Sequence, residues 1–555
     1  MKAIRSIITP VLFALLSLLF ALTIVSKWYP FFGKVGVVTW YISFGLFFIL
    51  AFKNLGFILK SLTKKKYVLT FTMILFLTGL VILHFNDSKS ISFETANQTN
   101  CILTHLENAD DWGFNKTCMN GYPARQYLLS ALPTLFLGRS PLALHLGGSL
   151  YLFLGLFIFS GSALRLFNDE KIGDIAVASI LAAFLHLTYF NHFMFIYEQS
   201  IFPFSMSLIA VGLLLDFERK AAFQTIFFIG IICMYLVFSY TPGLASYFLI
   251  VALLATFLFK KGQERFTKPA IAIVMIFSLI SFWLSLGVRS DINIRGGATT
   301  IQLKDDLTAG LKHLVWQDQG SPLVSPLFNF IFLGALFLGL FFIFGFQGFV
   351  IAVWSIGVLI LSVVSKGYWY YPIDFRLHRA LIIFPFIFFL IVEKLKALDL
   401  TSKKIRYASC ILFLFLFITG AAYHLRYMSM RKDSRNIRVM LWLRPHFATF
   451  MKLNVASGDK KNIIYFDTPL GGPIDDSYSS QKDFIAYFLP GSTSEILDSY
   501  CSGLLHNNGE NIFLFADDSE LQKDCYKNHS LTLKYMDSFY YKTDDELKFY
   551  RVSVR

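Results

Sequence analysis

Charged residues are scarce in this sequence. Asp, Glu, Lys and Arg make up only 15% of its 555 residues, whereas 55% are hydrophobic and the mean hydropathy is +0.57. No ordinary soluble protein has this balance. The composition therefore excludes a soluble globular fold and predicts a chain embedded in a membrane.

Several enzyme and cofactor motifs are also missing. The sequence contains neither a G-x-G-x-x-G nor a Walker A motif, which argues against a nucleotide-binding fold. It contains no G-x-S-x-G of a serine hydrolase, and no H-x-x-x-H pair with a third metal ligand nearby. No cofactor is therefore predicted with certainty, and a divalent metal is left as an alternative.

Long apolar runs recur up to about residue 423. Many are about 18 or more residues long, enough to cross a hydrocarbon core of roughly 30 Å. A backbone in lipid must satisfy its own hydrogen bonds, so about 13 of these runs are interpreted as transmembrane helices. The predicted spans are 8–26, 37–58, 68–85, 142–167, 172–190, 201–215, 224–240, 244–259, 270–286, 327–344, 349–364, 380–392 and 408–423. The sequence thus predicts an α-helical polytopic membrane protein.

The formal net charge of +14 comes mainly from basic residues between the spans. Clusters at 60–66, 260–268 and 394–406 fall on one side when the spans are threaded alternately. That side is cytoplasmic by the positive-inside rule. The opposite side receives the loops 86–125, 288–325 and 366–379 and the C-terminal tail. We therefore predict a multi-pass protein of the plasma (inner) membrane, and the charge implies no nucleic-acid partner.

The chain divides near residue 426. Residues 1–425 form the predicted membrane domain, and residues 426–555 form a predicted small extracytoplasmic α/β domain of ordinary size. Segments 462–467 and 511–518 resemble short buried strands, and 547–554 alternates like a strand. The helices expected in this domain lie at 482–489 and 519–526.

The six cysteines agree with this topology. Cys101 and Cys118 share the first long outer loop, and Cys501 and Cys525 share the C-terminal domain. Pairs of cysteines in an exported compartment favour two disulfides over four free thiols. The other two cysteines lie inside predicted spans, where a thiol is a small apolar side chain.

The loop 86–125 carries three carboxylates that could do chemistry. Glu94 follows the third predicted span closely, and Asp110 and Asp111 lie farther along the loop beside Trp112. A carboxylate just outside a membrane helix can accept a proton from an acceptor, which is the role of a general base. Adjacent carboxylates repel each other, so Asp110 and Asp111 are either both solvated or share a cation. The alternative is that all three are solvated loop charges.

Two more outer segments hold candidate residues. Tyr197 and Glu198 lie between the fifth and sixth spans, and an ionisable group at a membrane boundary is costly to keep there without a role. The loop 366–379 is rich in aromatic residues and ends in basic ones, namely Tyr371, Arg376, His378 and Arg379. Guanidinium groups suit phosphate oxygens, and aromatic rings suit interfaces. The alternatives are a snorkelling side chain and an ordinary aromatic belt.

Segment 121–145 opens with Gly121-Tyr122-Pro123-Ala124-Arg125 and runs into a new span. It resembles the re-entry segment of the GT-C superfamily of integral membrane glycosyltransferases, which have a Gly-x-Pro-Pro turn followed by a membrane-hugging helix. Tyr197-Glu198, the turn 240–243 and Arg379 with the following Pro385 resemble further family segments in the right order. Ala124 departs from the pattern, as do Glu94-Thr95, which replace an Asp-Glu pair, and the three spans before the loop.

The resemblance implies a sugar donor carried on a polyprenyl phosphate and an exported glycan, lipid or protein as acceptor. Glu94, or failing it Asp110 or Asp111, would activate the acceptor, and Glu198 would help shape the site. The residues implied in substrate binding are Tyr122, Arg125, Tyr197, Tyr371, Arg376, His378 and Arg379.

Two other functions stay open at this point. A lipid or glycan transporter or flippase needs charges inside the spans or broken helices near the midplane. The predicted spans are nearly free of charge, which favours an interfacial enzyme. A non-catalytic membrane scaffold with an exported domain is the third alternative.

Overall fold

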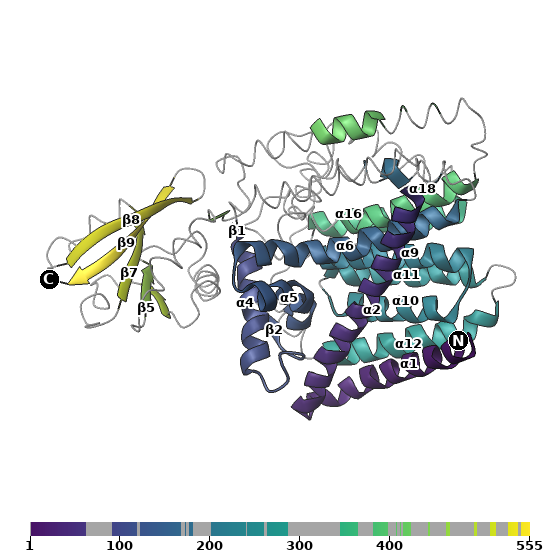
Figure 1. Ribbon diagram of the computed structural model, residues 1–555, viewed down its shortest axis with the longest axis horizontal. Helices are drawn as coiled ribbons and strands as arrows, with labels where there is room; N and C mark the ends of the chain where they lie inside the picture. Colours follow the sequence, from purple (N-terminus) through teal and green to yellow (C-terminus); the bar gives the residue numbers. More distant parts are fainter. Residues whose placement is uncertain are drawn as a thin grey trace. The chain divides into compact units, whose positions relative to one another are not determined.

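The computed structural model is drawn in Figure 1. The residues that it describes are 2–62, 91–118, 122–167, 177–180, 201–239, 241–259, 264–286, 345–364, 381–397, 414–422, 442–443, 462–466, 493–496, 511–517, 531–541 and 545–554, with a few isolated positions. They fall into two compact units. The first contains residues 1–81, 105–129 and 148–427, and the second contains 82–104, 130–147 and 428–555.

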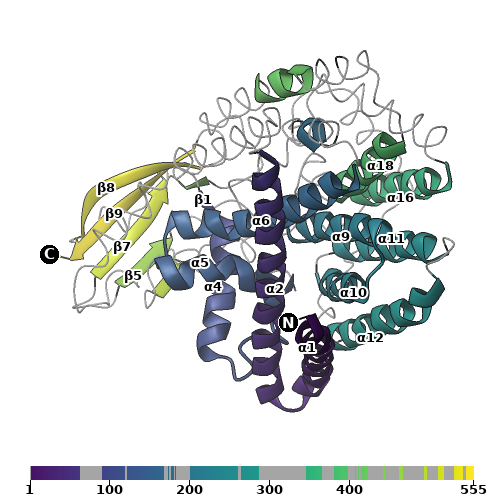
Figure 2. The ribbon, with the colours of Figure 1, turned by 45° about the vertical axis from the view of Figure 1, so that its right-hand side comes forward.

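The first unit is a bundle of apolar helices. Its long elements are α1 (Lys2–Leu22), α2 (Pro30–Leu62), α6 (Pro141–Leu166), α9 (Ile201–Arg219), α10 (Phe223–Val237), α11 (Thr241–Leu258), α12 (Thr267–Ser285), α16 (Gly345–Val364) and α18 (Ile383–Ala397). Helix α9 packs against α10, α11 and α18, and almost all of its side chains are buried. Helices α10 and α12 run side by side, as Figure 2 shows. Helices α9 and α10 therefore form the centre of this unit.

Four helices of the described residues are long and apolar enough to cross a membrane: Pro30–Lys60, Leu142–Leu166, Ile201–Arg219 and Thr267–Ser285. Four shorter apolar helices accompany them, at Val11–Lys27, Phe223–Val237, Gly243–Leu258 and Gly345–Ile360. These helices overlap predicted spans, which confirms those spans as apolar helices. The predicted spans 68–85 and 327–344 and most of 172–190 lie outside the described residues.

An aromatic cluster joins α2 to α10. The Trp40 ring lies 4.0 Å from the Tyr235 ring, and the Phe44 ring stacks on Tyr235 at 5.2 Å between centroids. The Ser43 and Tyr235 hydroxyls also share a hydrogen bond. All four side chains are buried. The contact fixes the first half of α2 against the centre of the bundle.

A largely buried ion pair joins α6 to α9; each side chain is 17% exposed. The Arg165 guanidinium binds both carboxylate oxygens of Asp216, with its Nη2 2.8 Å from Oδ2 and 3.1 Å from Oδ1. Arg165 also donates to the Asn54 side chain of α2, and the Ser162 hydroxyl donates to Asp216. Gly161 lets Asn54 approach, because a Cβ there would lie 2.5 Å from the Asn54 Oδ1. Three helices thus meet at one charged cluster near their ends.

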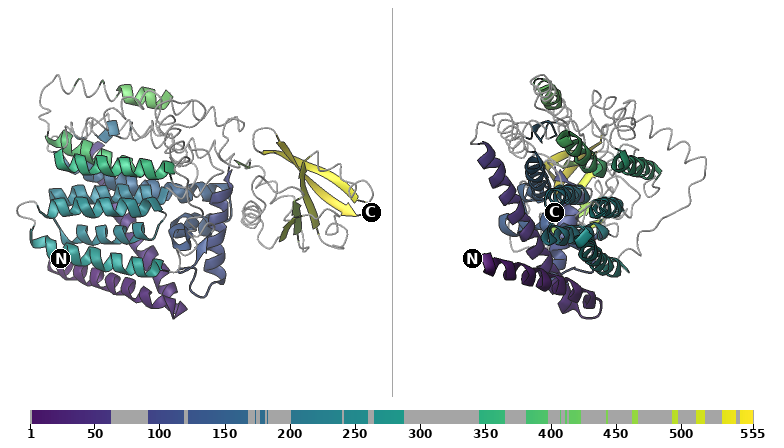
Figure 3. Two further views of the ribbon diagram at one scale, coloured as in Figure 1. Left: turned by 180° about the vertical axis from the view of Figure 1, so that it is seen from behind. Right: turned by 90° about the vertical axis from the view of Figure 1, so that its right-hand side faces the viewer.

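The second unit contains a five-stranded sheet with the order β6-β5-β7-β9-β8. Strands β5 (Asn462–Phe466), β6 (Thr493–Ile496) and β7 (Asn511–Asp517) are parallel. Strand β9 (Asp545–Val554) runs antiparallel between β7 and β8 (Leu531–Tyr541), the two long strands visible in Figure 3. The Phe513 and Phe549 rings stack at 5.5 Å. A further short pair joins β1 (Ile91–Ser92) to β4 (Trp442–Leu443).

The three strands that the sequence predicts in this part of the chain are confirmed as β5, β7 and β9. The short apolar runs of β5 and β7 are buried at consecutive residues, such as Ile463 and Ile464, and in β9 the buried Val552 alternates with exposed neighbours. The predicted helices at 482–489 and 519–526 lie outside the described residues. The boundary at residue 426 and the extracytoplasmic side of this domain stay predictions.

Candidate functional site

The loop 109–116 after α4 (Phe93–Asn108) is held by the carboxylate of Asp111. Asp111 Oδ1 accepts a hydrogen bond from the Gly113 backbone N–H at 3.0 Å, and Oδ2 accepts one from the Asn115 N–H at 3.0 Å. Asp111 is buried, whereas the neighbouring Asp110 is exposed. The two carboxylates are therefore not both solvated. Asp111 stabilises the turn, as Asx side chains do.

The turn contains two residues in the left-handed region. Gly113 has φ +77° and Trp112 has φ +54°. Glycine adopts this conformation freely, but a residue with a Cβ pays roughly 1–2 kcal/mol for it. Trp112 keeps the conformation because the residues on both sides of it are fixed.

Two glycines of α2 form the seat of this loop. A Cβ at Gly33 would lie 2.5 Å from the Asp111 Cβ, and one at Gly36 would lie 2.7 Å from the Phe114 ring. Only a residue without a side chain fits at either position. The Asn115 side-chain amide also donates to the Ser26 hydroxyl at 2.9 Å. The loop therefore lies directly on the first turns of a helix long enough to cross a membrane.

Arg125 ties the re-entry segment to the same loop. Strand β3 (Tyr122–Pro123) pairs with β2 (Thr117–Cys118) and leads into the 3-10 turn η3 (Ala124–Tyr127). The buried Arg125 guanidinium donates from Nη1 to the Phe114 carbonyl at 2.7 Å. It also lies 3.5 Å from the centroid of the Phe238 ring and 5.2 Å from that of Phe114. These contacts make Arg125 a positioning group that connects the loop to the end of α10.

Two tyrosines fix the segment that follows. The Tyr151 hydroxyl donates to the Gln126 carbonyl at 2.6 Å, and the Tyr41 hydroxyl donates to the Leu128 carbonyl at 3.0 Å. The tyrosines come from α6 and α2, so the turn is held by both helices. The re-entry turn is thus part of the buried core of the bundle.

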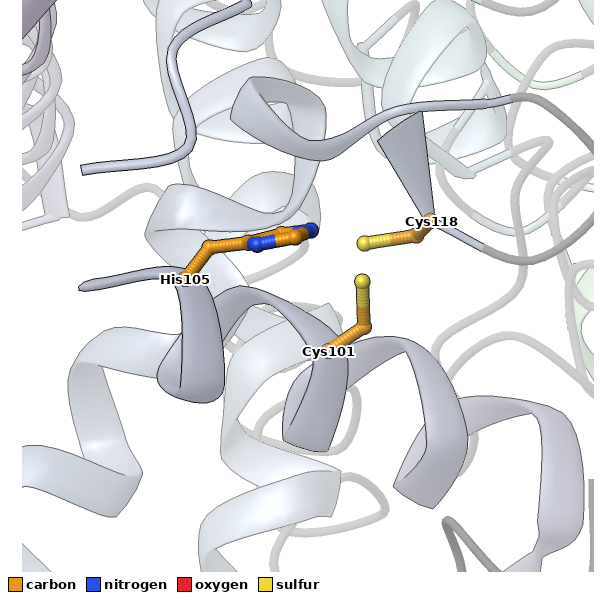
Figure 4. A group of neighbouring side chains, drawn as sticks. All are labelled: Cys101, His105 and Cys118. Atoms are coloured by element: carbon orange, nitrogen blue, oxygen red, sulfur yellow. The ribbon is translucent and has the colours of Figure 1, made fainter. Parts of the chain in front are cut away.

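Cys101 and Cys118 form the disulfide that the sequence predicts, and Figure 4 shows them beside His105. The ligand atoms of these three residues lie within 4.8 Å of one another. Metal binding requires thiolates, however, and a sulfur in a disulfide is not one. The His105 Nε2 lies 3.3 Å from the Thr117 carbonyl, which the protonated nitrogen binds as a donor. We therefore interpret the cluster as a staple that joins α4 to β2. Cys501 and Cys525 lie outside the described residues.

Replacing Cys118 by serine is expected to destabilise the protein by about 2–4 kcal/mol, because a disulfide that closes a short loop restricts the unfolded chain by that amount. The measurement is the melting temperature in detergent, with and without a reductant. Reductant should lower the melting temperature of the wild type more than that of Cys118→Ser, in which only the predicted Cys501–Cys525 pair is left to reduce. A reductant effect of equal size in both proteins would contradict this role of the pair.

The structure places only some of the predicted site residues. Glu94 is the second residue of α4, and Tyr122 lies in β3. The structure describes the backbone of both residues but not their side chains. Asp111 and Arg125 both bond to the loop 109–116: Asp111 accepts from the Asn115 N–H, and Arg125 donates from η3 to the Phe114 carbonyl. The other predicted site residues lie outside the described part of the chain: Tyr197, Glu198, Tyr371, Arg376, His378 and Arg379.

Sequence reasoning missed the seat of the loop. Gly33 and Gly36 lie at the start of an apolar run, where a Gly-x-x-Gly spacing on one helix face indicates close approach of another segment. Asn115 and Lys34, whose ammonium lies 5.6 Å from the centroid of the Trp112 ring, carried no signal of their own.

Comparison with known proteins gives a fold and no family. No family model matches the chain, and no curated protein matches it. The solved structure of ArnT from Cupriavidus metallidurans in the apo state matches with a TM-score of 0.51 and 10% identity, over 87% of this chain and 98% of that chain. The structure of the same protein bound to undecaprenyl phosphate has a TM-score of 0.49 and 11% identity, over 86% and 97%.

An identity of 10% shows a shared fold and no more. The likeness to the apo structure supports the GT-C fold that the sequence resemblance implies. Together with the apolar helices, it makes this chain an integral membrane protein.

Proposed function

We propose that this chain is a membrane glycosyltransferase. It moves a sugar from a polyprenyl-phosphate donor to an exported glycan, lipid or protein at the outer face of the plasma (inner) membrane. The fold shared with apo ArnT supports the proposal, since ArnT is a protein that has also been solved bound to undecaprenyl phosphate. A fold does not determine a function, so the argument depends on the site.

The observation that carries the proposal is the seated loop 109–116. It brings the exposed carboxylate of Asp110 and the buried one of Asp111 to the first turns of α2. An apolar bundle with a fixed polar loop at the end of a long apolar helix offers a reaction site to a substrate whose tail stays in lipid. A transporter would instead place its polar groups near the midplane.

The reaction is a displacement at the sugar. The acceptor oxygen or nitrogen attacks the anomeric carbon, the bond from that carbon to the phosphate oxygen breaks, and the polyprenyl phosphate leaves. A carboxylate takes the acceptor's proton as general base. We assign this role to Glu94, with Asp110 as the second choice, because both oxygens of Asp111 already bind the turn.

The other predicted residues have supporting roles in this proposal. Arg376 and Arg379 hold the donor phosphate and stabilise the charge that develops on it. Tyr122, Tyr197, Glu198, Tyr371 and His378 shape the substrate site. Arg125 positions the loop rather than the substrate, because its guanidinium is buried against Phe114 and Phe238. A divalent metal is not needed for these steps.

The test is a transfer assay with the full chain in nanodiscs. The donor is a radiolabelled sugar on undecaprenyl phosphate, and the acceptor is an extract of exported glycans, lipids and proteins. Transfer of label to the acceptor fraction supports an enzyme. If label only crosses the bilayer when the chain is placed in vesicles, the protein is a transporter and the proposal fails.

Arg379 is expected to set the affinity for the donor. Arg379→Ala removes a charge-assisted hydrogen bond worth about 1.5–3 kcal/mol, so the donor concentration for half-maximal rate should rise at least tenfold. Arg379→Lys keeps the charge and loses the planar fork, so it should keep part of the activity. Arg551→Ala, at an exposed position of β9, is the matched control. Unchanged donor dependence in Arg379→Ala would leave Arg379 as an interfacial anchor.

A further inference from the structure

The tip of the seated loop carries Trp112, a bulky residue in a backbone conformation that glycine adopts more readily. Trp112 holds φ +54°, which bulky side chains rarely adopt, while a glycine follows it at position 113. Its neighbour Phe114 is buried and serves as core. Trp112 is only half-buried, so part of this residue is exposed although its backbone is strained. Backbone strain of this kind clusters at binding sites, so the exposed part of Trp112 is a candidate ligand contact.

The loop around Trp112 is rigid. Asp111 binds the Gly113 and Asn115 backbones, Asn115 binds Ser26, and the loop rests on Gly33. A ligand that contacts Trp112 therefore meets a surface that is already in place, and little ordering is required on binding.

A basic group lies near the Trp112 ring, and an exposed acidic residue precedes it in the chain. The Lys34 ammonium lies 5.6 Å from the ring centroid, and the exposed carboxylate of Asp110 is two residues before Trp112 in the chain. An aromatic face takes the apolar face of a ring-shaped ligand, a carboxylate accepts hydrogen bonds from hydroxyl or amino groups, and an ammonium donates them. A sugar ring presents all of these features. The carboxylate repels anionic ligands, so acidic sugars fit less well.

We propose that Trp112, Asp110 and Lys34 form a carbohydrate subsite that recognises the acceptor as a neutral or amino sugar. This inference rests on the proposed function, because the occupant is the acceptor of that reaction. It selects a glycan, or a glycan-bearing lipid, from the acceptor classes named above.

The decisive variant is Trp112→Gly. Glycine adopts φ +54° without strain, so this substitution removes the ring and keeps the turn. The strain relieved at φ +54° offsets part of the cost of losing a half-buried ring and of a more flexible unfolded chain, so the melting temperature of Trp112→Gly in detergent should stay close to that of the wild type. Loss of binding then reports the ring rather than unfolding. Trp112→Phe keeps an aromatic face, and Trp28→Ala removes an exposed tryptophan outside the loop.

The assay is calorimetric titration of the full chain in nanodiscs, without donor. The probes are maltohexaose, chitohexaose, the deacetylated chitohexaose and hexagalacturonic acid. Saturable binding of at least one of the first three is expected, with hexagalacturonic acid weaker. Trp112→Gly should weaken that binding about tenfold or more, whereas Trp112→Phe and Trp28→Ala should change it less than threefold.

Three results would overturn the subsite. They are no saturable binding of any probe, equal binding by Trp112→Gly and wild type, and a preference for the acidic hexamer. Because no donor is present, the outcome is independent of transfer. Sugar binding without any transfer would count against the enzyme, and transfer without sugar binding would count against the subsite alone.

Discussion

Replacing Glu94 by glutamine is expected to lower the rate of sugar transfer about a hundredfold or more, since general acid–base catalysis contributes roughly 10²–10⁴-fold. Glutamine keeps the size and hydrogen-bonding capacity of glutamate and removes its basicity. Glu94 stands in the first turn of α4, the helix that leads into the seated loop. The measurement is the initial rate in nanodiscs at saturating donor, with equal amounts of folded protein.

Two amides on the same loop serve as comparators. Asp110→Asn should keep most of the transfer rate at saturating acceptor if Glu94 is the base, because its proposed role is in acceptor binding. Asp111→Asn should lower the melting temperature, because an amide supplies one acceptor oxygen for two backbone N–H donors. An active Glu94→Gln with an inactive Asp110→Asn would move the role along the loop. Wild-type rates in all three variants would be fatal to the enzyme proposal.

Replacing Asp216 by leucine is expected to destabilise the first unit by about 3–5 kcal/mol. The Arg165 and Asp216 side chains are each only 17% exposed, and removal of one partner leaves a buried charge without compensation. Thermal unfolding in detergent, followed by size-exclusion chromatography of the soluble fraction, measures the loss. The effect should appear as a large fall in melting temperature and in the amount of protein recovered.

The double variant Arg165→Met/Asp216→Leu separates charge from packing. Apolar replacement of a whole buried pair is often neutral or stabilising, so the double variant should recover most of the stability. Lys396→Ala tests a second pair, in which the Lys396 Nζ lies 3.5 Å from Glu218 and the two side chains are 38% and 12% exposed. The longer distance and the partly exposed lysine should make this loss smaller than that of Asp216→Leu. A double variant as unstable as Asp216→Leu would show that packing, rather than the unpaired charge, is the cause.

The elements that the sequence predicts well are those with long or strongly alternating patterns. The predicted span 201–215 lies within α9 and 142–167 overlaps α6, because uninterrupted apolar runs in lipid have only the helix available. Strand β9 was expected from alternation alone. Helix ends were less predictable: α2 begins at Pro30, seven residues before the span predicted from Val37. The loop 109–116 packs on these first turns, at Gly33 and Gly36.

The position of the seated loop in the chain could be predicted from the sequence, but the roles of its residues could not. Its carboxylates are visible in the sequence, yet the difference between exposed Asp110 and buried Asp111 depends on the glycines of α2, which are distant in the chain. Arg125 was expected to contact substrate from its position in the re-entry motif. Its burial against Phe238 depends on α10, and no local pattern shows it. Local sequence identifies candidate chemistry, whereas tertiary contacts decide which groups are committed to structure.

The contact between Arg125 and Phe238 also has a consequence for the order of biogenesis. Arg125 reaches the translocation machinery well before the ring on which it stacks, because α9 and α10 are synthesised between them. At about 5–20 residues per second, this interval is on the order of ten seconds. During that time the contact between the Arg125 guanidinium and the Phe238 ring cannot form. The newborn chain therefore completes the packing of loop 109–116 only after α9 and α10, the centre of the bundle, have been made.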